Sequence, residues 1–335
     1  MICEQTPTNQ EPVIELSGLT KYYGNQRAVD DLYLTVRKGE VFGLLGPNGA
    51  GKTTTILMML GLSEPTSGSA VVCGLDPVRS PLQVKRKVGY MPDDVGFYED
   101  RTALDNLLFT AGLNQIPAGE ARERAERLLE TVGLAESARK KVGAFSRGMR
   151  QRLGLADVLI KKPEVIILDE PTLGIDPEGV RELLALIRSL SREDGITVLL
   201  SSHHLYQVQQ ICDRVGLFVQ GRLLACGNID ELAESLNSSG TITVEMTVRN
   251  APDHLTEDLF SIPGVSKVLA DGLDSGKSDG SMNIQVICQA DVTSSLARAA
   301  VQSGAELTAI NRRTYGLDDI YHNYFEGSGR DEHTG

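Results

Sequence analysis

The sequence predicts an α/β protein with a mainly parallel sheet covered by helices on both faces, followed by a smaller α+β unit. Three observations support this prediction. Short apolar runs typical of buried strands alternate with stretches of helical periodicity through much of the chain. A glycine-rich loop lies between one of these strands and a helix. Beyond residue 240, apolar and polar residues alternate as they do in half-exposed strands.

The first elements along the chain are expected to be strands. Residues 13–16 and 32–36 alternate apolar and polar side chains, which is typical of half-buried strands. The turn at residues 39–40 leads into the apolar run 41–45, which we expect to be a buried strand. Residues 1–10 show no such pattern and are expected to form a loose tail, too polar for a secretory signal.

Helices are expected between about residues 102 and 160. Thr102 and Asp105 resemble a capping box in which Asp replaces the usual Glu. Apolar residues then recur at helical spacing as far as Gly133, which is a suitable stop. Two more buried strands, 165–168 and 196–200, are separated by a helix, and this order predicts a parallel sheet.

A second unit is expected after a linker at residues 237–240. Its strands and helices follow the order β-α-β-β-α-β, which is that of a small ferredoxin-like sandwich. Residues 271–280 are rich in Gly, Ser and Asp and are expected to form a hairpin loop. A short final helix would carry Leu317, Ile320, Tyr321 and Tyr324, before a tail at 327–335. The predicted domains are therefore residues 11–236 and residues 237–326.

Composition restricts the possible partners. The chain has 335 residues, which favours two domains, and 41% of them are apolar, enough for a substantial core. The formal net charge of −12 argues against broad binding of nucleic acid or anionic membranes. No run approaches the roughly 20 apolar residues that cross a bilayer, so a membrane function would need a second chain. The five cysteines lack CxxC spacing, which argues against a zinc site.

The clearest motif begins at Gly46 and fits G-x-x-x-x-G-K-[ST] in full. Glycines let backbone N–H groups turn toward a phosphate, and the following helix N-terminus adds partial positive charge. Lys52 can reach the β- and γ-phosphates, and the Thr53 hydroxyl can bind Mg²⁺. An ordinary glycine turn is the alternative, but the preceding strand and following helix argue against it. The expected nucleotide contacts are Gly46, Pro47, Asn48, Gly49, Ala50, Gly51, Lys52, Thr53 and Thr54.

A second motif is the apolar strand that ends in Asp169 and Glu170. In this position Asp169 can bind Mg²⁺, directly or through water, and Glu170 can orient and deprotonate an attacking water. Taken alone, the pattern also fits a buried strand that leaves the core through an acidic turn. Its combination with the phosphate loop favours a nucleotide hydrolase.

The segment from Phe145 to Leu153 separates the candidate classes of phosphate-loop protein. It reads F-S-R-G-M-R-Q-R-L and resembles the signature of the ABC ATPase family, L-S-G-G-Q followed by Q-R. Ser146 begins a helix, and such a serine cap is itself an anion site. The resemblance implies that Ser146 and Gly148 contact the γ-phosphate held by an opposing subunit. A serine cap without a ligand is the alternative.

The resemblance continues over about residues 12–235. Tyr23, in Lys-Tyr-Tyr-Gly, matches the family's adenine platform better than Tyr22 does, although either ring could simply pack in the sheet. Asp176, in Gly-Ile-Asp-Pro, matches the loop that joins opposed subunits and is also a good helix cap. His203, rather than His204, matches the switch histidine that contacts the γ-phosphate.

The sequence departs from the family pattern at three positions. Asp93 occupies the place of a glutamine that helps to hold Mg²⁺ and the attacking water; a carboxylate can still bind Mg²⁺ but adds negative charge. Arg147 replaces the first glycine of the signature, and Met149 replaces its glutamine. One interpretation is a catalytically weakened regulatory cassette. The interpretation we favour is a normal variant, since S-[KR]-G-M-[RK]-Q-[RK] and an acidic residue after Y-[LM]-P resemble exporters whose ATPase and membrane subunits are separate chains. Lys52, Ser146, Glu170 and His203 are all present, so we predict an active ATPase.

The resemblance implies a RecA-like core with an antiparallel β subdomain and a helical subdomain at about 94–160. It also implies ATP and Mg²⁺ as ligands, a homodimer or heterodimer of cassettes, and an integral-membrane permease as a separate chain at the cytoplasmic face. We expect no nucleic-acid partner. Alternatives are a soluble ABC protein acting on ribosomes or DNA, and an importer. The transported compound cannot be predicted, since the permease forms its path.

Overall fold

The computed structural model describes residues 11–204, 209–229, 231–232, 242–252, 254–270 and 281–313. The chain divides into two compact units, residues 1–229 and 230–335. Several predicted features lie outside the described residues: both tails, the linker, the 271–280 loop and the final helix. Along the described part of the chain, no helix combines the length and apolar character that crossing a bilayer requires.

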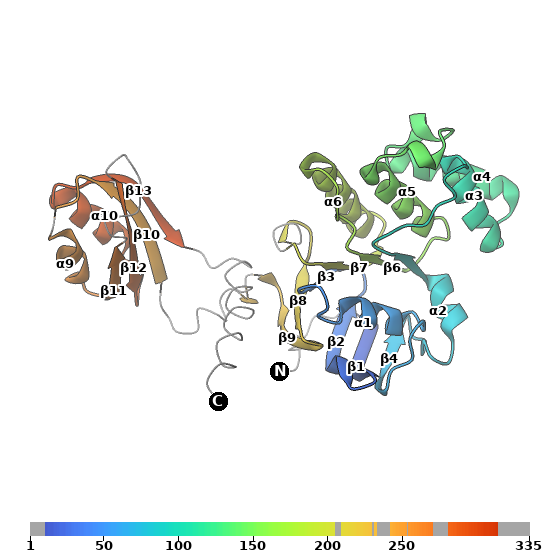
Figure 1. Cartoon of the computed structure of the whole chain (residues 1–335), viewed down its shortest axis with the longest axis horizontal. Helices are drawn as coiled ribbons and strands as arrows, with labels where there is room; N and C mark the ends of the chain where they lie inside the picture. The colour runs from blue at the N-terminus through green and yellow to red at the C-terminus, as the bar shows by residue number, and fades with distance from the viewer. Residues whose placement is uncertain are drawn as a thin grey trace. The chain divides into compact units, whose positions relative to one another are not determined.

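A six-stranded sheet forms the centre of the first unit, in the order β5-β6-β7-β3-β8-β9. Neighbouring strands are parallel except for the last pair, β8 and β9. All residues of β3 and β6 are buried, because helices cover both faces of a parallel sheet (Figure 1). The prediction of a mainly parallel sheet is confirmed. The strands are β3 (Val41–Leu45), β5 (Val88–Met91), β6 (Val165–Asp169), β7 (Thr197–Ser202), β8 (Arg214–Val219) and β9 (Arg222–Gly227).

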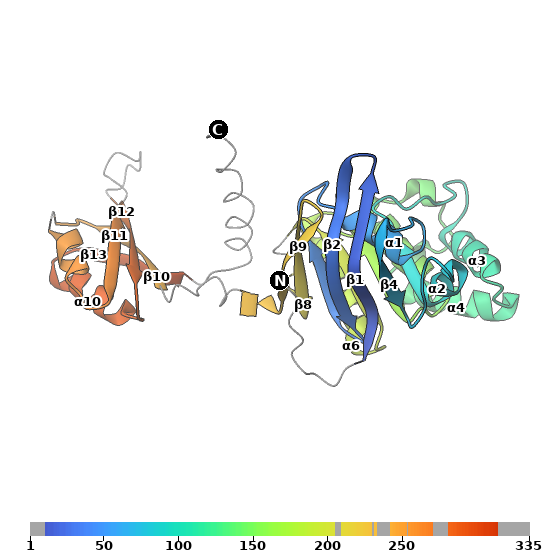
Figure 2. The same cartoon turned by 90° about the horizontal axis from the view of Figure 1, so that it is seen from below.

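An antiparallel sheet in the order β2-β1-β4 lies beside it (Figure 2). Its strands are β1 (Pro12–Tyr23), β2 (Gln26–Arg37) and β4 (Ser67–Val72). β1 extends well beyond the predicted strand 13–16. The pairing register shifts between Leu16 and Leu19, and Gly18 has a φ of +59°. Such a bulge interrupts the two-residue alternation, so the sequence pattern stops where the strand does not.

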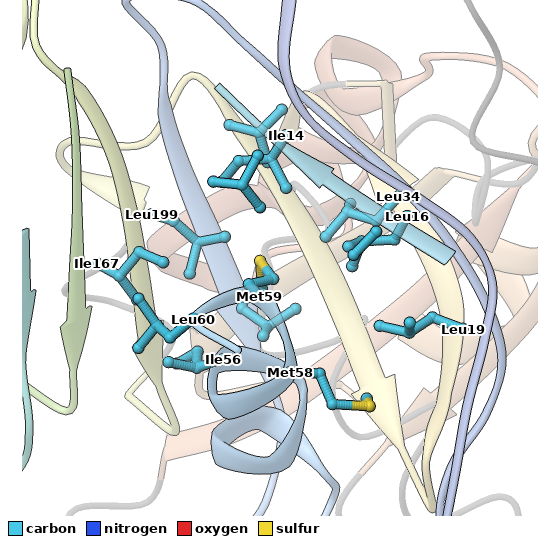
Figure 3. Packing of buried hydrophobic residues seen from close by; sticks show 14 of the residues in the cluster. Ile14, Leu16, Leu19, Leu34, Ile56, Met58, Met59, Leu60, Ile167 and Leu199 are labelled. Atoms are coloured by element: carbon cyan, nitrogen blue, oxygen red, sulfur yellow. The ribbon is translucent and has the colours of Figure 1, made fainter. Parts of the chain in front are cut away.

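The main core fills the space between the two sheets. Helix α1 (Lys52–Met59) follows the phosphate loop and places Ile56, Met58 and Met59 in this space. Figure 3 shows these side chains between the strands that carry Ile167 and Leu199 and those of the antiparallel sheet. The phosphate loop is therefore anchored at both ends by a buried element, β3 and α1.

Truncation in this core should reduce stability strongly. Ile167 is fully buried in β6, so we expect Ile167→Ala to lower the free energy of unfolding by about 2–5 kcal/mol, since it removes buried contacts and leaves a cavity. The measurement is urea unfolding of the full chain. Leu82→Ala is the control, because Leu82 is 73% exposed, and a loss of similar size there would contradict the argument.

The helical subdomain is built from α3 (Ala103–Leu113), α4 (Ala118–Thr131) and α5 (Arg147–Leu159), with two short 3₁₀ turns between the last two. The predicted capping box is present at Thr102 and Asp105. Gly133, at a φ of +70°, follows the end of α4. These helices share an apolar core of their own, to which α5 contributes one face. The first unit also contains α2 (Pro81–Lys87) and α6 (Pro177–Arg192).

The second unit is a four-stranded antiparallel sheet in the order β11-β12-β10-β13. The element order is β-α-β-β-α-β, as the sequence predicts, and the buried side chains of the two central strands meet the helices in a separate core. The elements are β10 (Ile242–Arg249), α9 (Leu255–Phe260), β11 (Val265–Ala270), β12 (Ser281–Cys288), α10 (Thr293–Gln302) and β13 (Glu306–Arg313).

Candidate functional site

The phosphate loop turns sharply between β3 and α1, and close contacts restrict its glycines. A Cβ atom on Gly46 would lie 2.3 Å from the Phe218 carbonyl oxygen. A Cβ on Gly51 would lie 2.3 Å from the Ala28 carbonyl oxygen, and Gly51 has a φ of +104°. Only glycine fits such positions. The loop backbone can thus curve around a phosphate group, and α1 begins directly after it.

Lys52 and Thr53 are the first residues of α1. The buried Lys52 Nζ donates hydrogen bonds to the carbonyl oxygens of Gly46 (2.7 Å) and Pro47 (3.2 Å), so the lysine spans the loop. The Thr53 hydroxyl donates to Asp169 Oδ2 at 2.9 Å. This bond brings together two residues 116 positions apart, both predicted to bind Mg²⁺. A hydroxyl and a carboxylate oxygen are hard ligands of the kind that Mg²⁺ prefers.

Asp169 ends strand β6 and Glu170 follows it, and the neighbouring strand β7 holds both in place. The Ser201 hydroxyl donates to Asp169 Oδ1. The Glu170 N–H donates to the Ser201 carbonyl oxygen (3.2 Å) and hydroxyl oxygen (3.1 Å). Ser201 was not among the predicted site residues. Ser201 could have been found only from the pairing of the two parallel strands, in which it lies opposite Asp169.

Glu170 adopts an uncommon backbone conformation. Its φ is +49°, in the left-handed region that residues with a Cβ seldom occupy. Such conformations concentrate at functional sites, where surrounding contacts enforce them. Glu170 Oε1 lies 3.4 Å from Lys52 Nζ, and Oε2 lies 2.9 Å from His203 Nδ1. Lys52, Glu170 and His203 thus form one cluster, although they come from three different elements.

The histidine pair distinguishes the two candidates for the switch residue. The His203 and His204 rings have centroids 3.9 Å apart, but only His203 bonds the Glu170 carboxylate. Burial lowers the pKa of His204, and the adjacent His203 lowers it further, against an opposing effect of Glu170. The geometry therefore favours His203, as the sequence spacing does.

Tyr23, at the end of β1, is anchored by neighbouring side chains and remains exposed. The Tyr23 hydroxyl lies 3.3 Å from Ser63 Oγ, and Lys21 Nζ lies 5.1 Å from its ring centroid. Lys21 Nζ also donates to the Glu64 carbonyl oxygen at 2.6 Å. The Tyr23 ring is thus held by its edge and one face while 51% of the residue stays exposed. An exposed, anchored ring can stack on a base.

Ser146 and Asp176 cap two helices. The Met149 N–H donates to Ser146 Oγ at 3.3 Å at the start of α5, and the Gly179 N–H donates to Asp176 Oδ2 at 3.2 Å at the start of α6. Within the described part of the chain, no hydrogen bond joins Ser146 to the phosphate loop. Gly148 is the second residue of α5, so Ser146 and Gly148 both lie at the start of this helix.

Asp93 lies on an exposed segment after β5 and accepts the Asp94 N–H at 2.9 Å. Burial raises the pKa of Tyr90 to about 12, and the negative charges of Asp169 and Asp93 contribute to this shift. The Asp93 backbone carbonyl accepts a hydrogen bond from the Gln151 side chain at 3.3 Å. Asp93 is therefore close to the site, but its carboxylate takes no part in the Thr53–Asp169 bond.

Comparison with known proteins gives a consistent picture. A family model described as "ABC transporter" matches residues 29–173. The bacitracin transport ATP-binding protein BcrA of Bacillus licheniformis is 36% identical over 309 residues, 92% of this chain and 96% of that protein. The daunorubicin resistance ATP-binding protein DrrA3 of Streptomyces coeruleorubidus is 35% identical over 312 residues, 93% and 95% of the two chains. A solved structure of the ATP-binding subunit of an ABC transporter matches with a TM-score of 0.61 at 30% identity, over 67% of this chain and 93% of that one.

Proposed function

The chain belongs to the ATP-binding subunits of ABC transporters, which hydrolyse ATP, and on this premise we propose that it powers the export of an antibiotic-like compound through a separate membrane subunit. Two copies of the cassette close around two ATP molecules at the cytoplasmic face of the membrane. The observation that carries the proposal is the cluster of Lys52, Glu170 and His203 beside the Thr53–Asp169 bond. It provides, in one place, a phosphate-binding cation, a base and a pair of oxygen ligands.

In the proposed mechanism, Lys52 exchanges its carbonyl partners for the β- and γ-phosphates of ATP. Thr53 and Asp169 would hold Mg²⁺, and its charge would offset the negative charge that develops on the phosphates. Glu170 accepts a proton from the attacking water. His203 contacts Glu170 through Nδ1, so Nε2 is the nitrogen left to face the γ-phosphate. Asp93 is proposed as a further group near the metal, and to bind there its carboxylate would have to release the Asp94 N–H.

The second half of each site comes from the opposing copy. Ser146 and Gly148, at the start of α5, are proposed to contact its γ-phosphate, because a capped helix start with unbonded N–H groups attracts anions. ATP then favours the closed pair, since its γ-phosphate touches both copies, and hydrolysis removes that contact.

The export assignment comes from the relatives. BcrA is named for bacitracin transport and DrrA3 for daunorubicin resistance, and both align with more than nine tenths of this chain. The matches therefore include the second unit, which we propose to be a ferredoxin-like domain that stabilises the cassette or its dimer. The strand order β11-β12-β10-β13, with every pair antiparallel, supports this fold.

Co-purification tests the proposed assembly. The tagged full chain, isolated in mild detergent from its native membrane, should carry an integral-membrane protein in a fixed ratio. Cells that overproduce both chains should tolerate more of a peptide or anthracycline antibiotic than cells with a Glu170→Gln cassette. A chain that binds no membrane protein and fractionates with ribosomes or DNA would contradict export.

Substitution of Tyr23 should weaken nucleotide binding. We expect Tyr23→Ala to raise the Kd for ATP by about 5- to 150-fold, corresponding to loss of roughly 1–3 kcal/mol of base stacking. Tyr23→Trp should keep most of the affinity, because it keeps an aromatic face. Tyr22→Ala is the matched control on the adjacent residue. Titration with a fluorescent ATP analogue measures the change, and a larger effect at Tyr22 would transfer the role to that ring.

A further inference from the structure

Arg147, where the family signature has glycine, makes a specific contact within its own chain. It is the first residue of α5 and follows the capping residue Ser146. Its Nε–H donates a hydrogen bond to the Leu173 carbonyl oxygen at 2.5 Å. A charged donor makes a stronger bond than a neutral one. The start of α5 is therefore tied to the 171–176 loop, which leads from Glu170 to helix α6.

The loop is shaped to receive this side chain. Gly174 has a φ of +72°, and a Cβ there would lie 2.8 Å from Arg147 Cδ and 2.9 Å from its Nε. The guanidinium end of the arginine thus lies across the Gly174 backbone. A second contact between the loop and α5 is made by Ile175. Its Cγ2 lies so close to two glycines that a Cβ added to Gly148 would be 3.4 Å from it, and a Cβ added to Gly179 would be 2.7 Å from it. Ile175 therefore packs between the starts of α5 and α6.

The same loop is also bonded to the backbone of Glu170. The Leu173 N–H donates to the Glu170 carbonyl oxygen at 3.1 Å, while the Leu173 carbonyl accepts from Arg147. A single residue, Leu173, thus links the Glu170 backbone to the Arg147 guanidinium through its own N–H and C=O groups. Glu170 needs such support, because its φ of +49° is seldom adopted without enforcing contacts.

We infer that Arg147 is a positioning residue that couples the two ATP sites of the dimer. This inference rests on the proposed function, in which Ser146 contacts the ATP of the opposing copy while Glu170 acts on the ATP of its own. Arg147 joins these elements through Leu173. When ATP bound to the opposing copy pulls the start of α5 toward itself, the 171–176 loop moves with α5. This movement places Glu170 for hydrolysis of the ATP bound to its own copy. ATP in one site therefore prepares hydrolysis in the other.

The test compares steady-state hydrolysis by the wild-type chain and by Arg147→Ala over a range of ATP concentrations. We expect kcat to fall about tenfold, the size of effect that loss of a charged hydrogen bond produces. The Hill coefficient for ATP should fall toward 1, while the ATP concentration at half-maximal rate changes less than about twofold, because no residue of the phosphate loop is altered. Arg147 is exposed, so the melting temperature should not change.

Three further single variants and one double variant separate positioning from a general surface effect. Arg181→Ala is the matched control, because the Arg181 Nε–H also donates to a backbone carbonyl, that of Pro177 at 3.4 Å, but within its own helix. It should leave kcat and the Hill coefficient unchanged. Arg147→Lys keeps a charged donor and should restore most of both values. Gly174→Ala should resemble Arg147→Ala, and the double variant should lose less than the product of the two single losses, because without Arg147 the methyl group has space.

Three results would overturn the inference: a Hill coefficient of 1 in the wild type, no difference between Arg147→Ala and Arg181→Ala, or weakened ATP affinity with cooperativity intact. The last result would mean that the guanidinium contacts nucleotide directly. Failure of the proposed function is a different outcome, in which the wild-type chain hydrolyses no ATP at all.

Discussion

Glu170→Gln should reduce ATP turnover by about 10²- to 10⁴-fold, because an amide cannot accept the proton of the attacking water. Binding should survive, since Lys52 and the loop backbone are unchanged, and Gln keeps the shape of the side chain. Because hydrolysis is what removes the γ-phosphate contact, the closed dimer should accumulate. Size-exclusion chromatography with magnesium ATP measures the dimer, and phosphate release measures turnover.

Glu164→Gln is the matched control for this change. Glu164 directly precedes strand β6, at its opposite end from Glu170, and pairs with Lys87 at 2.9 Å. We expect its variant to hydrolyse ATP at the wild-type rate and to form no stable dimer. Wild-type turnover in Glu170→Gln would remove Glu170 from the role of general base. Lost turnover without a dimer would instead count against closure by ATP.

Much of the nucleotide-binding unit can be predicted because its chemistry lies in local patterns. The phosphate loop, the acidic end of β6 and the capping residues each need particular side chains at fixed spacing, so a short stretch of sequence identifies them. The same is true of the capping box at Thr102 and Asp105, which the structure confirms. These features depend on neighbours in the chain and not on distant packing.

What the sequence could not reveal depends on contacts between distant residues. The extent of β1 is one case, because the bulge at Gly18 breaks the alternation on which a strand prediction rests. Ser201 is another, since its role follows from pairing with Asp169 across two strands 32 residues apart. Arg147 is the third. In the sequence it reads as a departure from a signature, and only the fold shows that its side chain lies on Gly174.

Mixing two inactive variants should restore hydrolysis if each site is shared between two copies. Lys52→Ala removes the phosphate-binding cation, and Ser146→Arg blocks the start of α5 that faces the opposing ATP. Each should be nearly inactive alone. A mixed dimer joins the intact Lys52 of one copy to the intact Ser146 of the other at one of its two sites. With random pairing, half of the dimers are mixed, so activity should reach about a quarter of the wild-type value, or less where both sites must act together.

The control is a chain that carries both substitutions. Mixed with Lys52→Ala, it forms no dimer with an intact site, so activity should stay at the level of the parents. The comparison shows that recovered activity requires an intact Lys52 in one of the two copies, because every chain of the control mixture lacks it. If the mixture of single variants were as inactive as its parents, while melting temperatures showed folded chains, either Lys52 and Ser146 act within one chain or one intact site does not support turnover; ATP-dependent formation of the mixed dimer, measured by size-exclusion chromatography, separates the two, since only a shared site holds ATP between the copies. We expect activity to return because Ser146 caps α5 in its own copy while Lys52 bonds the phosphate loop, and no hydrogen bond among the described residues joins Ser146 to that loop.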